Sequence, residues 1–258
     1  MKLIVLVKEV PDTYGDRKLN LETGLADRAA SDAVLDEITE RAMEAALTYA
    51  EANEGTEVVA LALAPDGSVA TVRKALAMGA GSAIHIADEA LLGADVTLTA
   101  EALSAAIRRA GFDLVIAGNV STDGASGMVP AAVAENLGAA YLSGLSSLEI
   151  ADGKVSGSRP VDGGVQRVSA SLPAVVSITE TLPDPRFPNF KGIMAAKKKP
   201  LETLTLADLE VAADNPEVAR SIMLTVAEKP PREAGIKITD EGDAGEKLAE
   251  FLAENRLV

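Results

Sequence analysis

Apolar runs alternate with helical repeats along the first half of the chain. The continuous apolar run 3–7 predicts a strand, and the mostly apolar segments 57–63, 83–86 and 114–117 predict three more. The segments whose apolar positions recur at helical spacing are residues 32–51, 69–78, 95–109 and 129–137. Strands that are apolar throughout are typical of a parallel sheet covered on both faces. The alternation therefore predicts an α/β fold with a doubly wound, mostly parallel sheet.

The pattern changes after Gly144. Short strand-like runs now follow one another without helices, at residues 145–150, 155–158, 166–171 and 174–178. The pairs Asp152-Gly153 and Asp162-Gly163 lie between them, and aspartate–glycine pairs between strands indicate hairpins. We expect an antiparallel extension that joins the edge of the parallel sheet.

The last part of the chain has a different character. The segment Lys229-Pro-Pro-Arg232 forms a stiff spacer, and residues 245–258 place apolar side chains on one side of a short helix. We therefore divide the chain into an α/β domain, residues 1–228, and a C-terminal spacer and helix, residues 229–258. Such a helix either folds back or packs on a partner subunit.

The amino-acid composition excludes several classes of binding and redox chemistry. The 258 residues include 39 acidic and 24 basic side chains, and the net charge of −15 opposes binding to nucleic acid or an anionic membrane. Without cysteine the chain forms no disulfide, thiolate metal site or iron–sulfur cluster, so any redox role needs a bound cofactor. His85 alone forms neither a catalytic triad nor a metal site, and we predict no catalytic residue. The apolar N-terminus is too short for a membrane span and lacks a cleavage motif, so we expect a cytoplasmic protein.

The best candidate for a small-molecule site is the loop 118–127, with the sequence GNVSTDGASG. It lies between a predicted strand and a predicted helix, where open α/β sheets bind ligands and a helix N-terminus offers free amides to a phosphate. Gly124 and Gly127 permit close backbone approach. The loop lacks the lysine and spacing of a Walker A motif, so we expect nucleotide binding without triphosphate hydrolysis. An ordinary connection between strand and helix uses similar residues.

A candidate protein-binding surface follows the last predicted strand. Three prolines at 183, 185 and 188 restrict the backbone and remove amide donors, so residues 183–199 are expected to project as an arm. The arm ends in the basic triplet 197–199 and carries apolar side chains at Phe187, Phe190, Ile193 and Met194. Apolar side chains on a polar-rimmed protrusion are typical of a protein-binding site, and the alternative is that they pack on their own domain.

Six sequence motifs lie in order along nearly the whole chain. They read VKEVPD from Val7, KALAMGA from Lys74, the loop from Gly118, RPVDGGVQ from Arg159, LPAVV from Leu172 and PRFPNFKGIMAAKKKP from Pro185. With these motifs the chain resembles the β subunit of electron transfer flavoproteins. The resemblance implies a Rossmann-like fold of the adenine-nucleotide-hydrolase-like type, with an antiparallel extension and a C-terminal arm.

The resemblance also implies cofactors. In that family the glycine-rich loop holds the phosphate of a buried AMP, with contacts from the first strand and the start of the first helix. Carried over to this sequence, the AMP-binding positions are Leu6, Val7, Lys8, Asp36, Leu63, Gly118, Asn119, Ser121, Thr122, Asp123, Gly124, Ser126 and Gly127. The chain departs from the family at residues 33–35, where many members carry Asn-Pro-aromatic, and at Met128, where many carry glutamine. FAD is held mainly by the α subunit, and the loop after the first strand closes over its edge, which implies flavin contact for Tyr14.

The resemblance finally implies partners. The family's recognition loop anchors the complex on acyl-CoA dehydrogenases through one apolar side chain, and Phe190 falls at that position. We therefore expect an electron carrier rather than an enzyme, the β subunit of a heterodimer with an α subunit. It would pass electrons from flavin dehydrogenases of fatty acid β-oxidation to a quinone oxidoreductase. One alternative is an electron-bifurcating, NADH-oxidising form with a second FAD in place of AMP. Another is a stand-alone nucleotide-binding regulator of the universal-stress type.

Overall fold

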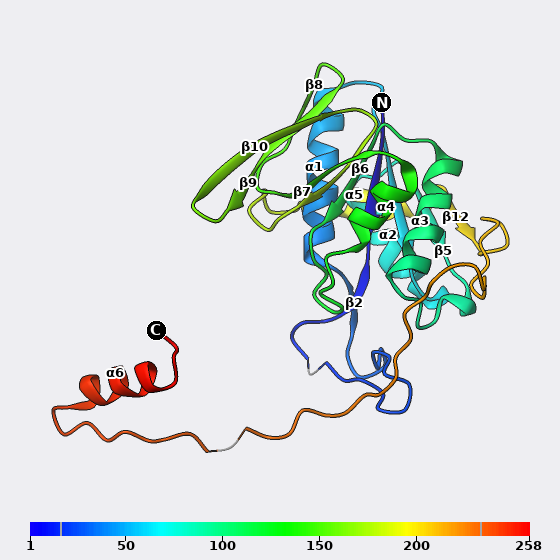
Figure 1. Ribbon diagram of the computed structural model, residues 1–258. Helices are drawn as coiled ribbons and strands as arrows, with labels where there is room; N and C mark the ends of the chain where they lie inside the picture. The colour runs from blue at the N-terminus through cyan, green and yellow to red at the C-terminus, as the bar shows by residue number, and fades with distance from the viewer. Residues whose placement is uncertain (16, 233) are drawn as a thin grey trace. The chain divides into compact units, whose positions relative to one another are not determined.

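The computed structural model describes residues 1–15, 17–232 and 234–258, and it divides into two compact units, residues 1–224 and 225–258 (Figure 1). A seven-stranded sheet forms the centre of the first unit, in the order β12-β5-β4-β1-β6-β11-β7, with every neighbouring pair parallel. Its strands are β1 (Lys2–Val7), β4 (Glu57–Leu63), β5 (Ser82–Ile86), β6 (Leu114–Gly118), β7 (Ala140–Leu145), β11 (Ala174–Ile178) and β12 (Leu201–Leu204). The predicted α/β fold is confirmed.

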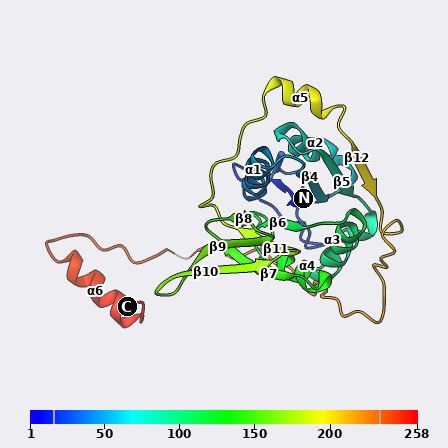
Figure 2. The ribbon, with the colours of Figure 1, turned by 90° about the horizontal axis from the view of Figure 1, so that it is seen from above.

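Helices cover both faces of this sheet. They are α1 (Glu37–Ala52), α2 (Val69–Met78), α3 (Val96–Ala110) and α4 (Val129–Leu137). In Figure 2, α1 and α2 lie on one side of the central strands and α3 and α4 on the other. Successive residues of β1 point to opposite faces, so Leu3 and Val5 join the core under α1 and α2, whereas Ile4 and Leu6 join the core under α3 and α4. Two buried faces explain why the central strands are mostly apolar.

The expected antiparallel extension is corrected in two ways. Residues 174–178 form β11, which lies parallel between β6 and β7 in the main sheet, and the antiparallel strands form a sheet of their own instead of joining the edge of the main sheet. They are β8 (Glu149–Ala151), β9 (Lys154–Val161) and β10 (Gly164–Ser171), in the order β10-β9-β8. One edge of the main sheet is β7, whose last residue is Leu145. Beyond it the Ser146 amide donates to the Ser158 carbonyl at 2.7 Å. A Cβ on Gly157 would lie 2.1 Å from the Ser147 carbonyl oxygen, so glycine lets the chain cross β9 here.

Two further elements differ from the pattern-based expectation. The first helix was predicted from residue 32 but begins at Glu37, because residues 33–35 form the short strand β3 (Ala33–Leu35), which pairs antiparallel with β2 (Glu9–Pro11). The edge strand β12 was not predicted at all. Short 3-10 turns occupy Asp66–Ser68 and Glu89–Leu91, and the helix α5 (Phe190–Ala196) precedes β12.

In its described residues, 225–232 and 234–258, the second unit contains one helix, α6 (Ala244–Glu254), in which no residue is buried. The amphipathic helix expected near the C-terminus is therefore present, and its packing on a partner subunit stays a prediction. Within the described parts of the chain, no helix has the length and apolar character needed to cross a membrane.

Candidate functional site

A cavity of about 740 Å³ opens at the carboxyl ends of β1, β4 and β6. The chain builds β4 and β5 on one side of β1 and then returns to build β6 on the other, so the connections from β1 and β6 diverge here. Open α/β sheets bind ligands at such a switch point. The predicted AMP-binding residues that line the cavity are Leu6, Val7, Lys8, Leu63, Gly118, Asn119, Ser121, Asp123, Gly124, Ser126 and Gly127.

Asp36 and Thr122 are not among the residues that line the cavity, and they contact each other instead. The Thr122 amide donates to Asp36 Oδ2 at 2.9 Å, so the carboxylate at the start of α1 braces the glycine-rich loop. Burial raises the pKa of Asp36, although amide donors from Thr122 and Ile38 oppose the shift. Among the described residues, Asp36 Oδ1 and Thr122 Oγ1 are buried without a hydrogen-bond partner. Such groups suit a ligand or an ordered water.

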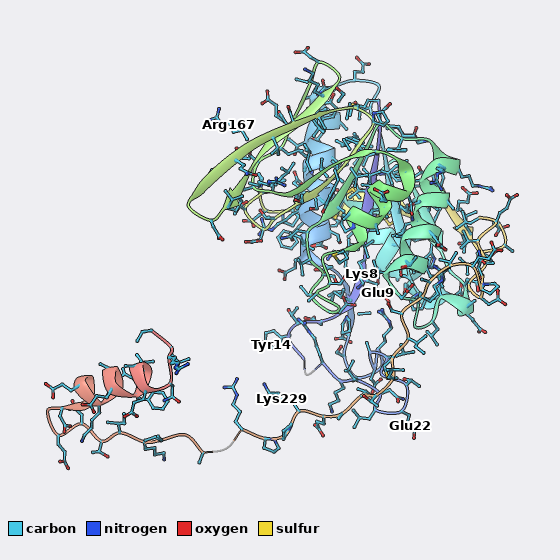
Figure 3. The ribbon with its side chains drawn as sticks, viewed as in Figure 1. Lys8, Glu9, Tyr14, Glu22, Arg167 and Lys229 are labelled. Atoms are coloured by element: carbon cyan, nitrogen blue, oxygen red, sulfur yellow. The ribbon has the colours of Figure 1, made fainter. Side chains whose placement is uncertain are left out.

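Lys8 places a positive charge inside the cavity, directly after β1 (Figure 3). Its Nζ lies 2.6 Å from Asp123 Oδ1 and donates to Ser121 Oγ at 3.3 Å. Burial alone would raise the pKa of Asp123, but the hydrogen bond and charge of Lys8 hold the pKa below its usual value. The ion pair therefore ties the end of β1 to the loop that follows β6.

Three more cations line the cavity, and our sequence reasoning missed them. Arg17, Lys18 and Arg28 come from the long loop between β2 and β3, and Arg17 donates to the Thr122 carbonyl. The loop between β2 and β3 also carries five acidic residues, so its charge pattern offered no signal for these cations. Apolar side chains form another part of the wall, including Leu25, Leu61, Leu91, Leu103 and Val129. A cavity with cations and amides on one part and an apolar wall on another suits a phosphorylated, partly aromatic ligand.

Tyr14 is fully exposed, and it is not among the residues that line the cavity (Figure 3). It lies on the loop after β2, where its amide donates to Asp12 Oδ1 at 2.9 Å. His85 is fully buried in β5 with Nε2 3.0 Å from the Ala64 carbonyl oxygen, which fits the structural role expected for it.

The arm, residues 183–199, is not a free projection, because α5 packs along α2. Its position on the domain corrects the expectation of a protruding segment. Its apolar side chains nevertheless face outward: Phe187 and Phe190 are 93% and 80% exposed, and Ile193 and Met194 are about half exposed. An apolar patch therefore lies on the surface of a packed helix, bordered by exposed Lys191 and Lys197.

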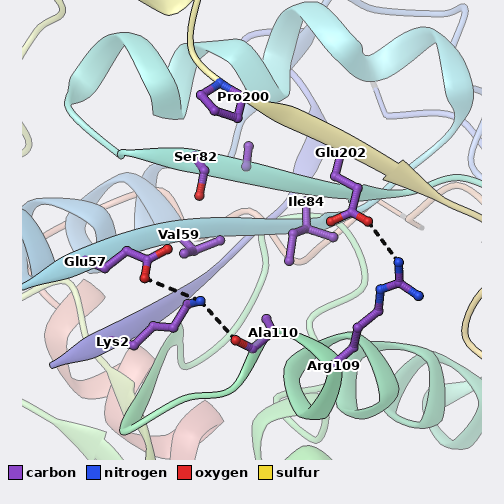
Figure 4. Close-up of a pocket in the computed structure, with 10 residues that line it drawn as sticks. Lys2, Glu57, Val59, Ser82, Ile84, Arg109, Ala110, Pro200 and Glu202 are labelled. Atoms are coloured by element: carbon purple, nitrogen blue, oxygen red, sulfur yellow. Dashed lines mark hydrogen bonds and ion pairs between the residues drawn. The ribbon is translucent and has the colours of Figure 1, made fainter.

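A second, smaller hollow of about 380 Å³ lies at the opposite, amino end of the strands (Figure 4). Its charged groups neutralise each other, since Lys2 pairs with Glu57 at 3.4 Å and Arg109 pairs with Glu202 at 3.1 Å. None of the predicted cofactor-binding residues lines this hollow, so we assign it no ligand.

The fold and the cavity define a doubly wound α/β protein with a candidate ligand site at the switch point. The family model for the electron transfer flavoprotein domain matches residues 23–209. A β subunit of electron transfer flavoprotein from Mycobacterium tuberculosis is 46% identical over 263 aligned residues, covering 99% of each chain. The Syntrophomonas wolfei β subunit is 36% identical, covering 98% of this chain and 96% of its own. A subunit of the caffeyl-CoA reductase–Etf complex of Acetobacterium woodii, CarD, is 31% identical, covering 83% and 82%. The chain belongs to the electron transfer flavoprotein β-subunit family.

Proposed function

We propose that this chain is the β subunit of a heterodimeric electron transfer flavoprotein and binds AMP in the switch-point cavity. The cavity carries the proposal, because its size is within the range of small-molecule sites. The glycine-rich loop presents amides and hydroxyls where one phosphate would lie, and Lys8 adds a cation from the end of β1. The apolar wall suits an adenine ring. Lys8 and the amides of Gly124 and Gly127 would hold the phosphate.

The chain's own residues bind and orient rather than react. FAD, held mainly by the α subunit, supplies the electron-transfer chemistry when bound. The loop that carries Tyr14 lies beside the cavity-lining segment 17–28 and would close over the flavin edge from the β side. Because Tyr14 is fully exposed, its ring is available to a partner subunit.

The partners follow from the same assignment. The apolar patch of the arm would dock on flavin dehydrogenases of the acyl-CoA dehydrogenase type, and the reduced heterodimer would deliver electrons to a quinone oxidoreductase. Exposed aromatic side chains are suitable anchors because buried aromatics dominate interface energies. We expect Phe190→Ala to leave the flavin content unchanged and to raise the KM for the dehydrogenase.

The matched control is Leu92→Ala, which removes a similarly exposed apolar side chain outside the arm. Steady-state electron transfer from a reduced acyl-CoA dehydrogenase, with each heterodimer as acceptor, compares the two variants. Equal KM values for Phe190→Ala and Leu92→Ala would refute the docking role.

The stand-alone regulator is disfavoured by the family assignment and is tested by co-expression. A chain that works as a β subunit should co-purify with its α subunit as a yellow complex, whereas a homodimer without flavin absorbance would contradict the proposal. The bifurcating form uses the same scaffold, and the nucleotide content of the purified complex separates it from the carrier.

A further inference from the structure

The arm is attached to the domain on both sides of its apolar patch. The four patch residues are Phe187, Phe190, Ile193 and Met194. Before them, the backbone is tied to α1, and from Gly192 onward it is tied to α2. The segment that carries the patch is therefore held by two anchors.

The first anchor is Arg186, which bridges two carboxylates on one face of α1. Its Nε donates to Glu44 Oε2 at 2.7 Å, its Nη2 donates to Glu44 Oε1 at 2.9 Å, and its amide donates to Glu44 Oε2 at 3.0 Å. The same guanidinium is also paired with Glu51, two helical turns further along. Bidentate pairs of this kind fix direction as well as distance. Just before it, Arg41 pairs with Asp184 at 2.6 Å.

The second anchor is made by α2. A Cβ on Gly192 would lie 2.5 Å from the Ala77 carbonyl oxygen, so the backbone of α5 touches α2 directly. Arg73 donates to the Ala196 carbonyl at 2.7 Å. The Lys199 ammonium donates to the carbonyls of Leu76 and Ala80, at 3.0 and 2.7 Å. Lys199 thus caps the C-terminal end of α2 and is not part of a basic surface.

Neither anchor includes a side chain of the patch. Each anchor can therefore be removed without changing the apolar surface that a partner would contact. A flexible arm has to be ordered on binding, and that ordering weakens the complex, whereas an arm already held in place avoids this loss. Arg186 is the better probe because its partner Glu44 is nearly buried, with 14% of the side chain exposed.

We propose that Arg186 is a positioning residue that holds the arm in its docking conformation through Glu44 and Glu51. It raises the affinity for the dehydrogenase without contacting it. This inference rests on the proposed docking function of the arm.

The test uses the full heterodimer with Arg186→Gln, and with Lys191→Gln as the control for loss of an exposed charge on the same arm. Hydrogen exchange measures the order of the arm directly. We expect exchange over residues 186–196 to be at least about tenfold faster in Arg186→Gln, because the local opening free energy falls when the anchor is lost. We expect the KM for the reduced dehydrogenase to rise roughly three- to tenfold at unchanged kcat. Lys191→Gln should leave exchange unchanged.

A double variant separates positioning from a general loss of stability. In a Phe190→Ala background, Arg186→Gln should change the KM by less than about twofold, because the contact that it positions is already lost. Unchanged hydrogen exchange in Arg186→Gln, or faster exchange at an unchanged KM, overturns the positioning role of Arg186. Either result leaves the docking role of the arm to be judged from the KM of Phe190→Ala. If Phe190→Ala itself has no effect, the docking function fails and the positioning role fails with it.

Discussion

Replacing Lys8 by methionine tests the nucleotide site most simply. Methionine keeps most of the side-chain length but removes the charge that lies 2.6 Å from Asp123 in the cavity. Two effects follow. The Asp123 carboxylate, 13% exposed, loses its partner, and a bound phosphate loses a nearby cation.

The magnitudes follow from the exposure of the pair. Removing one partner of a fully buried ion pair costs about 3–5 kcal/mol, whereas an exposed pair contributes about 0–1 kcal/mol. Lys8 is 38% exposed, so solvent screens part of its charge, and we expect a loss of about 1–2 kcal/mol in the free energy of unfolding. A charge-assisted hydrogen bond to phosphate contributes about 1.5–3 kcal/mol. With the same screening, we expect AMP affinity to fall by roughly tenfold.

The control is Lys2→Met, at the other end of the same strand. Lys2 has a similar exposure and pairs with Glu57, but it lies at the amino end of β1, away from the switch-point cavity. Calorimetric titration of nucleotide-free heterodimer with AMP, together with urea unfolding, measures both effects. Lys2→Met should bind AMP like the parent protein. An unchanged AMP affinity in Lys8→Met would refute the placement of the phosphate near Lys8.

Three further outcomes are expected. Gly118→Ala should lower the free energy of unfolding, measured by urea titration, by about 1–3 kcal/mol, because the new Cβ would lie 2.6 Å from Ile38 Cγ2. An unchanged free energy of unfolding would contradict the tight packing of β6 on α1. Hydrogen bonding from Arg186 lowers the pKa of Glu44 below its ordinary value of 4.5. The Glu44–Arg186 pair therefore stabilises the fold fully above pH 4.5, and this stabilisation is lost as the pH falls through the lowered pKa of Glu44. Urea unfolding between pH 6 and pH 3 should therefore decline less steeply in Glu44→Gln, and parallel profiles would argue against the pair. Ile116→Ala, in the fully buried centre of β6, should cost about 2–5 kcal/mol, against less than about 0.5 kcal/mol for the exposed Val165→Ser.

The repeating part of the fold was predictable because its cause is local. Each strand of the main sheet from β1 to β6 is an apolar run, and the helices between them show their buried faces in the spacing of their side chains. The strands β2, β3, β7 and β12 escaped prediction because each depends on a partner distant in sequence. The segment 140–145, AYLSGL, carries serine and glycine and becomes a strand only by pairing with β11.

The candidate site was predictable to a similar degree. The residues after β1 and in the Gly118 loop follow strands, so the α/β topology brings them together. Arg17, Lys18 and Arg28 lie in an irregular loop whose path no periodicity indicates. The attachment of the arm was equally hidden, because Arg186 and Glu44 are far apart in the sequence and only the folded chain brings them together.

The nucleotide content of the purified heterodimer tests the central claim most directly. Acid or heat releases bound nucleotides, and chromatography with absorbance detection quantifies them against the protein. The account predicts one FAD and one AMP for each heterodimer. Two flavins without AMP, or no adenine mononucleotide at all, would contradict it.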